Sequence, residues 1–310
     1  MATFARGTNF ELVVDAMVLL KIMKHYREHF PVLVSGYLLG LDRENKLEIT
    51  SCFETPAKTD EDEREHDIAK YQDDMLKVLE EVHGDNNIIG WYQCVYLGSY
   101  LRDPTMIETQ CEYQELIEKA VVLVYDPQQT SVGKFPFRAL RVSDAFMRRR
   151  RTAQSAQPPK PLDLHSMTAA DVLEEVPLKL RNTFLMEAFL STWALPTADR
   201  EQALFTGLKL NNQQFLEKHV SLLTQAVDDL QSEQVKMQGY ERNLFRMQMR
   251  KARGEAADDR KAVAPSQLDS MLISSQVGSY CKQLEAHAGG SMGKMMLLKK
   301  AAHNDREAKE

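Results

Sequence analysis

Two histidines flank a glutamate at the spacing that some zinc hydrolases use: His25, Glu28 and His29. Residues four apart on a helix share one face, so both imidazoles could hold one Zn²⁺ while the carboxylate activates a water molecule. The motif falls in the last turn of a predicted helix, directly before Phe30 and Pro31, where the helix dipole favours a histidine without any metal. Because so short a pattern also arises by chance, we favour a structural helix end and keep a zinc hydrolase as the alternative.

Three other motifs could carry chemistry, and each has a simpler explanation. Residues 289–294 (GGSMGK) are similar to a phosphate-binding loop, but the spacing is one residue short and Met295 replaces the hydroxyl that binds Mg²⁺. Cys94 could be a nucleophile, but no histidine lies near it in sequence, and a small buried strand residue is the plainer interpretation. Arg148, Arg149, Arg150 and Arg151 could contact RNA phosphates. No aromatic residues interleave with them, so the end of a solvated linker is favoured.

Composition narrows the classes of protein to consider. The chain has 310 residues, 43% of them hydrophobic and 27% charged, which is typical of soluble proteins with about two domains. A net charge of -6 does not favour a general nucleic-acid binder. The four cysteines show no paired spacing, which favours a reducing compartment. Glu11 and Asp15 interrupt any signal-peptide core, and no apolar run approaches the ~20 residues of a membrane span, so we expect a cytoplasmic protein.

Strands and helices intermingle in the N-terminal half. Apolar runs and alternations predict strands at 10–14, 31–41, 46–53, 87–97, 120–125 and 134–142. Helices are predicted at 15–29, 67–83 and 105–119. We expect Asp15 to cap the first of these helices, and Thr105 to begin the third in a capping box with Glu108. This mixture predicts an α/β or α+β domain over residues 1–150.

The composition changes at Arg148. Residues 151–170 are rich in Pro, Gln and Ser, which predicts a linker. Residues 171–310 are predicted to be helical, apart from a possible short strand at 176–180. The strongest periodicity lies between residues 211 and 251, where leucine and methionine recur every seven residues. It predicts one helix of about 40 residues, roughly 60 Å long. Its stripe consists of Leu216, Leu223, Leu230, Met237 and Leu244, with Tyr240 and Met247 beside it.

This stripe needs a partner. Burying its five Leu and Met side chains contributes roughly 7–15 kcal/mol before the entropy of ordering is subtracted. Residues 268–287 could supply an intrachain hairpin. The C-terminal segments look too few to cover both helices, so we expect the stripe to bind helices of other proteins.

Residues 88–95 (IIGWYQCV), 109–110 (TQ) and 121–127 (VVLVYDP) resemble the MPN domain family. That resemblance implies a central mixed sheet flanked by helices. Active members are Zn²⁺-dependent isopeptidases whose strand reads G-W-Y-H-S-H. In them two histidines and an aspartate hold the metal, and a glutamate on an earlier strand acts as base.

Position by position, the resemblance places the two histidines at Gln93 and Val95, the aspartate at Met106 and the glutamate at Leu33. A catalytic zinc needs three protein ligands and an open fourth position. Leucine cannot take a proton from water. The resemblance therefore implies an MPN domain that has no catalytic residue, binds no cofactor and is not an enzyme.

Among inactive MPN families, the chain resembles the h-type subunits of eukaryotic translation initiation factor 3. The resemblance is carried by residues 91–99, 173–182, 212–218, 268–273 and 280–281, in the same order along the chain. The chain departs from the pattern at residues 103–106 and in the Gly-rich C-terminal segment.

The resemblance implies a non-catalytic scaffold component that supports pre-initiation complex assembly on the small ribosomal subunit, mRNA recruitment and scanning. It implies pairing of the folded domain with the f-type MPN subunit, and a helical bundle with the PCI-domain subunits. Contact with mRNA is possible, and no membrane contact is expected. An MPN component of the proteasome lid or of the COP9 signalosome is the alternative assembly.

Overall fold

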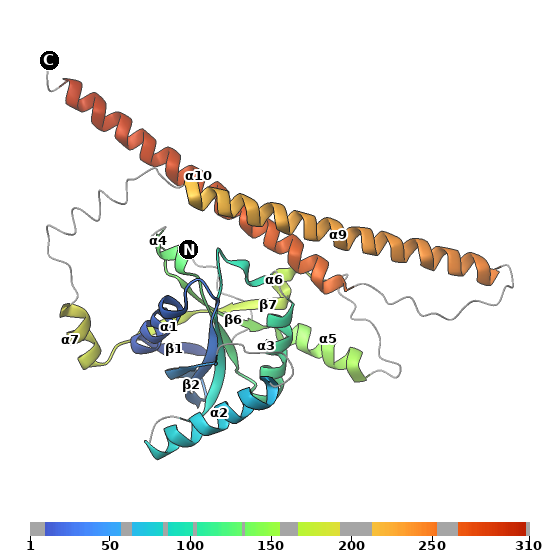
Figure 1. Ribbon diagram of the computed structural model, residues 1–310, viewed down its shortest axis with the longest axis horizontal. Helices are drawn as coiled ribbons and strands as arrows, with labels where there is room; N and C mark the ends of the chain where they lie inside the picture. Colours follow the sequence, from blue (N-terminus) through green and yellow to red (C-terminus); the bar gives the residue numbers. More distant parts are fainter. Residues whose placement is uncertain are drawn as a thin grey trace. The chain divides into compact units, whose positions relative to one another are not determined.

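The chain forms two compact units, residues 1–192 and 193–310 (Figure 1). The computed structural model describes residues 10–56, 64–82, 86–101, 104–131, 134–155, 167–192, 213–252 and 266–307. No helix in these ranges is both long and apolar enough to cross a membrane.

Eight strands form one mixed sheet in the first unit. The resemblance to the MPN domain family implies a central mixed sheet, and this expectation is confirmed. The strand order is β7-β6-β5-β4-β2-β3-β1-β8. The pairs β1–β3, β1–β8 and β4–β5 are parallel, and the other four pairs are antiparallel. The strands are β1 (Glu11–Asp15), β2 (Ser35–Arg43), β3 (Lys46–Glu54), β4 (Ile88–Cys94), β5 (Val121–Tyr125), β6 (Phe137–Val142), β7 (Leu173–Val176) and β8 (Leu178–Arg181).

Helices cover both faces of this sheet. α1 contributes Val18 and Ile22 to the larger hydrophobic core, while α2 and α3 pack on the opposite face around Tyr37, Leu39 and Phe53. Successive side chains of a strand point to opposite faces of the sheet, so each strand contributes core residues to both faces. The helices of this unit are α1 (Ala16–His29), α2 (Arg64–Glu81), η1 (Ser99–Leu101), α3 (Thr105–Leu116), α4 (Pro127–Ser131), α5 (Asp144–Ser155), α6 (Ala169–Val172) and α7 (Phe184–Thr192).

The predicted strands all form, but β2 begins four residues later than the apolar run at 31–41. The Val32 amide donates to the His29 carbonyl at 2.9 Å, which makes a turn that closes α1. Residues in this turn cannot join the sheet, so Val32 and Leu33 are exposed instead of buried in a strand. The expected position of Leu33 within a covered strand is therefore wrong.

The two predicted helix caps also differ from the structure. Asp15 occupies the N-cap of α1 without a side-chain capping bond, and its carboxylate lies 3.3 Å from the Arg181 guanidinium instead. The N-cap of α3 is Pro104, so Thr105 is already helical and does not occupy the cap position. The Pro104 carbonyl accepts the Glu108 amide at 3.1 Å. The helices begin where the sequence predicts, for different local reasons.

Residues 173–181, which we name the closing strap, join the two ends of the strand order. β7 pairs with β6 and β8 pairs with β1, yet only Pro177 separates β7 from β8. Consecutive Cα atoms lie 3.8 Å apart, so strands this close in sequence cannot stand at distant edges of a flat sheet. The Arg141 guanidinium of β6 also lies 5.8 Å from the ring of Phe10, directly before β1. The sheet therefore curls until its two ends share one bent strand.

The closing strap corrects the predicted domain organisation. A change of composition at Arg148 predicts the end of the folded domain there, but the sheet continues to Arg181. Residues 148–151 belong to α5, which continues to Ser155. Of the predicted linker at 151–170, residues 156–166 lie outside the described ranges. The segment 171–310, predicted to be helical apart from one possible short strand at 176–180, therefore begins with two short strands, β7 and β8.

The second unit contains two long helices, α9 (Gln213–Ala252) and α10 (Gln267–Glu307). His219, near the start of α9, packs against Tyr280 with ring centroids 5.5 Å apart. Lys236, later in α9, interacts electrostatically with Asp269, which comes earlier in α10. The two helices therefore run antiparallel. The long helix predicted at 211–251 is confirmed. Residues 289–294 lie inside α10, so the segment that is similar to a phosphate loop is helical.

Acidification is expected to loosen this hairpin. Burial, together with His287, lowers the pKa of His219 below its ordinary 6.5. The unfolded chain then binds the proton at higher pH than the folded chain does. Stability is therefore full above pH 6.5 and is lost as the pH falls through the folded pKa, by about 1.4 kcal/mol per unit of separation. Hydrogen exchange at about pH 7.5 and about pH 5.5, on either side of the ordinary histidine pKa, should show weaker protection of α9 at the lower pH.

The variant His219→Leu provides the control, because it removes the titrating group and keeps the site apolar. Its α9 amides should be equally protected at both pH values once intrinsic exchange rates are taken into account. A wild-type hairpin whose protection does not change on acidification would contradict the expectation.

Candidate functional site

The positions that correspond to the metal ligands lie around the ends of β2 and β4. Gln93 pairs with Ser35 in the sheet register, and the Cys94 amide donates to the Val34 carbonyl at 2.8 Å. Leu33 precedes Val34, and Val95 follows directly after β4, where its amide donates to the Tyr125 carbonyl at 2.9 Å. Met106 comes from the first turn of α3 and is buried. The strand ends thus place Leu33, Gln93 and Val95 near one another.

These side chains do not fit a zinc ion. Val95 and Met106 are each 3% exposed and contribute packing surface, while Leu33 is 51% exposed. The side-chain oxygen of Gln93 is buried, with no hydrogen-bond partner among the described residues, and it is the one oxygen donor of the four positions. Within the described ranges no three His, Cys, Asp or Glu side chains are grouped to hold a metal.

The His25, Glu28 and His29 motif is used for packing. The His25 Nδ1 atom lies 2.8 Å from the Tyr92 hydroxyl, and its Nε2 atom lies 3.5 Å from a Glu54 carboxylate oxygen. If Nε2 carries the proton toward Glu54, the Tyr92 hydroxyl donates to Nδ1. Burial lowers the pKa of His25, and Glu54 partly offsets that effect. Both ring nitrogens are therefore occupied within the domain.

The other two groups of the motif point elsewhere. The Glu28 carboxylate lies 3.6 Å from the Lys24 ammonium, one helical turn earlier. The His29 Nδ1 atom lies 3.1 Å from the His25 carbonyl oxygen, which an N–H at that position would satisfy at the helix end. The structure thus accounts for all three residues through contacts within α1 and with the sheet.

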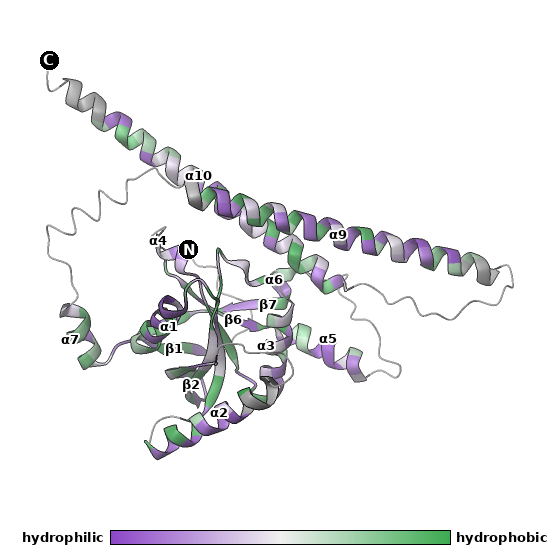
Figure 2. Cartoon of the chain, viewed as in Figure 1, coloured by the Kyte–Doolittle hydropathy of each residue, from purple (hydrophilic) through white to green (hydrophobic). Residues whose placement is uncertain are grey.

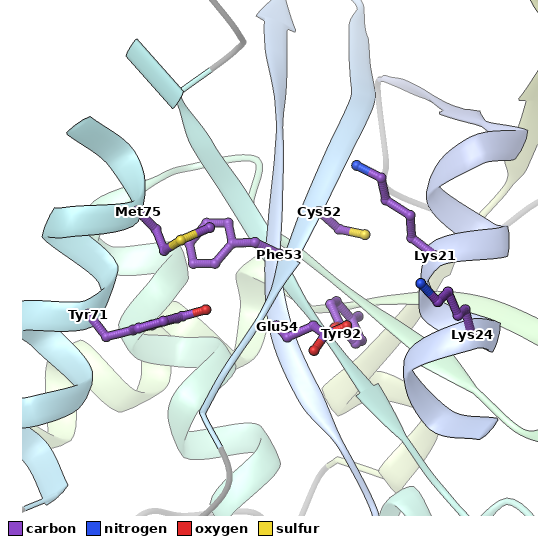
Figure 3. Close-up of a pocket in the computed structure, with 8 residues that line it drawn as sticks. All are labelled: Lys21, Lys24, Cys52, Phe53, Glu54, Tyr71, Met75 and Tyr92. Carbon is purple, nitrogen blue, oxygen red and sulfur yellow. The ribbon is translucent and has the colours of Figure 1, made fainter. Parts of the chain in front are cut away.

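A pocket of about 330 Å³ lies beside this histidine, between α1 and α2 at the end of β3 (Figure 3). Lys21 and Lys24 form one wall and Tyr71 and Met75 the opposite wall. Cys52, Phe53, Glu54 and Tyr92 also line the pocket. Burial raises the pKa of the Cys52 thiol to about 12, so it stays protonated at neutral pH. This thiol is a packing group rather than a nucleophile.

Cys94, the candidate nucleophile, is fully buried in the larger core. Burial raises the pKa of its thiol to about 12. A protonated, inaccessible thiol is a poor nucleophile. The interpretation of Cys94 as a small buried strand residue agrees with its position in β4.

A buried amide network crosses the other face of the sheet, and the residue patterns along the chain did not predict it. The Trp91 indole N–H donates to the Gln110 side-chain oxygen at 2.9 Å, and the Gln110 amide donates to the Ala120 carbonyl at 2.8 Å. Gln114 accepts the Val142 amide at 2.8 Å and donates to the Val142 carbonyl at 3.0 Å. α3 is therefore joined to β4, to the residue before β5 and to β6. Only the four-residue spacing of the two glutamines on one helix face could have hinted at this network.

A different surface, on α9, is a better candidate for function. The predicted stripe faces α10 at its centre, where Ala226 and His219 are buried, and Leu223, Leu230 and Met237 are half-buried. Tyr240 and Met247 are also half-buried, while Leu216 and Leu244 are 39% and 37% exposed. The intrachain hairpin with residues 268–287 therefore forms and covers much of the stripe. Whether the stripe also binds other proteins stays a prediction.

α9 also carries a second apolar stripe. Val220, Val227, Phe245 and Met249 are between 44% and 60% exposed. At about 100° per residue they fall within roughly 40° of one another around the helix. This outer face, as we name these four residues, lies beside the side that α10 covers. A helix with one apolar side occupied and another open suits a bundle of more than two helices.

The two helices also continue past each other, as Figures 1 and 2 show. α10 carries five exposed apolar side chains in its C-terminal half. They are Met292, Met295, Met296, Leu297 and Leu298. Exposed apolar side chains gathered in one segment are typical of an interaction site in a folded protein.

Sequence comparisons with known proteins match two consecutive segments of the chain. Residues 8–119 match the family described as JAB1/Mov34/MPN/PAD-1 ubiquitin protease, and residues 130–256 match the C-terminal region of eIF3h. The first match contains β1 to α3 and all four degenerate positions. The second contains the closing strap and α9.

Three relatives share most of their length with the chain. The H subunit of eukaryotic translation initiation factor 3 from Arabidopsis thaliana is 36% identical, covering 94% of this chain and 92% of the relative. Proteins of the same name from Dictyostelium discoideum and Nematostella vectensis are each 33% identical, covering 92% of both chains. Identity at this level over nearly the whole length, together with the MPN sheet and the long C-terminal helices, shows that the chain belongs to the H-subunit family of eukaryotic translation initiation factor 3.

Proposed function

We propose that the chain is a non-catalytic scaffold component of the initiation factor 3 complex in the cytoplasm. In this role it supports pre-initiation complex assembly on the small ribosomal subunit, mRNA recruitment and scanning. Membership of the H-subunit family supports the assignment of the chain to this complex. The outer face of α9 is the observation that carries the scaffold role, because it is apolar surface that α10, its neighbour in the described part of the second unit, leaves open.

The degenerate site supports the non-catalytic part of the proposal. A hydrolase of this fold needs hard donors and a base, and the chain offers Leu33, Gln93, Val95 and Met106 at those positions. Metal analysis of the purified chain tests this directly. Zinc bound at one equivalent per chain would contradict a purely structural MPN domain.

We propose two kinds of partner within the complex. The folded MPN domain pairs with the f-type MPN subunit, and α9 and α10 join a helical bundle with the PCI-domain subunits. The hairpin supports the second contact, because its two helices align only part of their lengths and expose apolar residues on both remaining ends.

The bundle can be tested with the variant Val227→Asp with Phe245→Asp. Both residues are exposed on the outer face, so the hairpin should stay folded. Burying each side chain against a partner contributes roughly 1.5–3 kcal/mol, and a buried aspartate is worse than a lost contact. Incorporation into the complex, measured by affinity purification with mass spectrometry, should fall by about 100-fold or more, since each 1.4 kcal/mol is about tenfold in affinity.

The matched control is Ser232→Asp with Asn243→Asp, which adds the same charge to exposed positions on the far side of α9. This control should co-purify normally. A second variant, Leu223→Asp with Leu230→Asp, should lose incorporation as the outer-face variant does. Its reason differs, because these residues face α10 and the hairpin itself would open. Normal co-purification of the outer-face variant would count against the bundle. Capture of components of the proteasome lid or the COP9 signalosome instead would assign the chain to a different assembly.

A further inference from the structure

α5 presents arginines to solvent from a folded helix. Arg148, Arg149 and Arg151 are exposed, while Arg150 is half-buried and hydrogen-bonds with Cys111 of α3. At about 100° per residue, the three exposed arginines span roughly 160° of the helix, and Arg150 turns to the domain side. The four consecutive arginines are therefore divided between one anchoring side chain and three exposed ones.

The first turn of α5 is held firmly to the domain. Phe146 is 1% exposed and Met147 is 5% exposed, and the Ser143 hydroxyl accepts the Phe146 amide at 3.3 Å. Figure 2 shows hydrophobic residues at the start of α5 and hydrophilic ones toward its end. This arrangement fixes the exposed arginines in space, which lowers the entropy lost when they bind a partner.

Arg149 helps to lower the pKa of Asp171, so one acidic group lies near α5. Along the chain itself, α5 has few acidic neighbours. No acidic residue occurs in the sequence between Asp144 and Asp163. Asp144 is itself occupied, since one of its carboxylate oxygens accepts the Arg141 guanidinium at 2.6 Å. Across the described ranges, neither Arg148 nor Arg151 makes an ion pair. A chain of net charge -6 thus carries a local cluster of positive charge.

The surroundings of these arginines favour a nucleic acid over a protein. A protein interface needs an apolar centre, and the exposed half of α5 offers no large apolar side chain. It offers Thr152, Gln154 and Ser155, which can hydrogen-bond to phosphate and sugar oxygens. No aromatic residue stands among the arginines to stack on the bases of a single strand. Charge and hydrogen bonds alone suit a phosphate backbone.

We propose that α5 binds the phosphate backbone of double-stranded RNA through Arg148, Arg149 and Arg151, without reading its sequence. The choice of RNA rests on the proposed function, whereas the surface itself rests on the geometry of α5. Arginine binds phosphate with two parallel N–H donors, which favours these residues for the contact.

The test uses the full chain and an RNA duplex of about 20 base pairs, somewhat longer than one double-stranded RNA-binding module covers. Binding is measured by fluorescence anisotropy over a range of salt concentrations. The variant Arg148→Gln with Arg149→Gln and Arg151→Gln should weaken binding by about tenfold or more near ~0.1 M salt. It should also make the slope of log K against log salt shallower by about 2–3, because each phosphate contact contributes about 0.9. Replacing the same three arginines with lysine should restore most of the salt slope.

The matched control is Arg27→Gln with Lys70→Gln and Lys134→Gln, which removes three exposed cations elsewhere in the same unit. It should bind within twofold of the wild type. Equal losses in both triple variants would overturn the assignment to α5, as would unchanged binding in the α5 variant. A variant that binds RNA normally but loses an acidic protein from the complex would also overturn it. Failure of RNA binding leaves the helical-bundle test unaffected, because the two are measured on different surfaces.

Discussion

A chain that ends at residue 150 is expected not to fold, whereas a chain that ends at residue 192 should unfold cooperatively. The shorter chain lacks the closing strap and so leaves β6 and β1 without their outer partners. Val172 and Val176 would also be lost from the core, and each contributes roughly 1.5–3 kcal/mol by burial. Whole domains are stabilised by only about 5–15 kcal/mol.

Charge pairs add to the loss. Arg138 of β6 donates to both carboxylate oxygens of Glu175, at 3.0 and 2.7 Å. Arg181 lies 3.2 Å from a carboxylate oxygen of the buried Glu48. Removing residue 181 leaves Glu48 with the longer Arg43 contact, at 3.7 Å. Unpaired strand edges and an exposed core together predict aggregation as well as instability.

Thermal unfolding followed by circular dichroism, with gel filtration, tests this expectation. The chain 1–192 is the control, and it should elute as a compact species with a sharp transition. A second control is Val176→Asp in the full chain, which should weaken the first unit without shortening it. If the 1–150 chain melted at the same temperature as the 1–192 chain, the strap would not be part of the folding unit.

The closing strap shows what local patterns can and cannot predict. Residues 176–180 are typical of a short strand, and the structure has two short strands there, β7 and β8. The sequence of so short a strand does not indicate which neighbour it pairs with. The partners of β7 and β8 come from the curvature of the whole sheet, which brings its ends together at Pro177. Long apolar runs such as β5, in which every residue is buried, are predictable because central strands need no local partner information.

The candidate site also has features that the sequence can predict and features that it cannot. The absence of metal ligands at Gln93, Val95 and Met106 can be recognised from residue types alone. The location of Leu33 cannot, because the turn that closes α1 displaces the start of β2. Composition predicts that the arginines of α5 lie at the end of a linker. It contains no information on the burial of Phe146 and Met147, which anchors a helix at this point. Heptad periodicity finds the α9 stripe, but period alone cannot distinguish a helix of the same chain from a partner's helix.

Replacing Gln114 with alanine is expected to lower the free energy of unfolding of the first unit by roughly 3–6 kcal/mol, because several buried polar groups lose their partner. Its side chain accepts the Val142 amide and the Gln110 amide, at 2.8 and 3.2 Å, and donates to the Val142 carbonyl. Gln114 is only 5% exposed, so water cannot easily replace it. Each buried polar group left without a partner costs about 1–3 kcal/mol.

Urea unfolding of the chain 1–192, in which Trp91 is the one tryptophan of the sequence, measures the change by fluorescence. Glu115→Ala is the matched control, since Glu115 is exposed on the same helix and should change stability by no more than about 0.5 kcal/mol. Gln114→Met separates the hydrogen bonds from packing, because methionine keeps most of the volume but offers no amide. We expect it to lose nearly as much stability as alanine, since three polar partners lose their contact in both variants. A methionine variant as stable as the wild type would mean that the volume of Gln114, rather than its amide, joins α3 to β6.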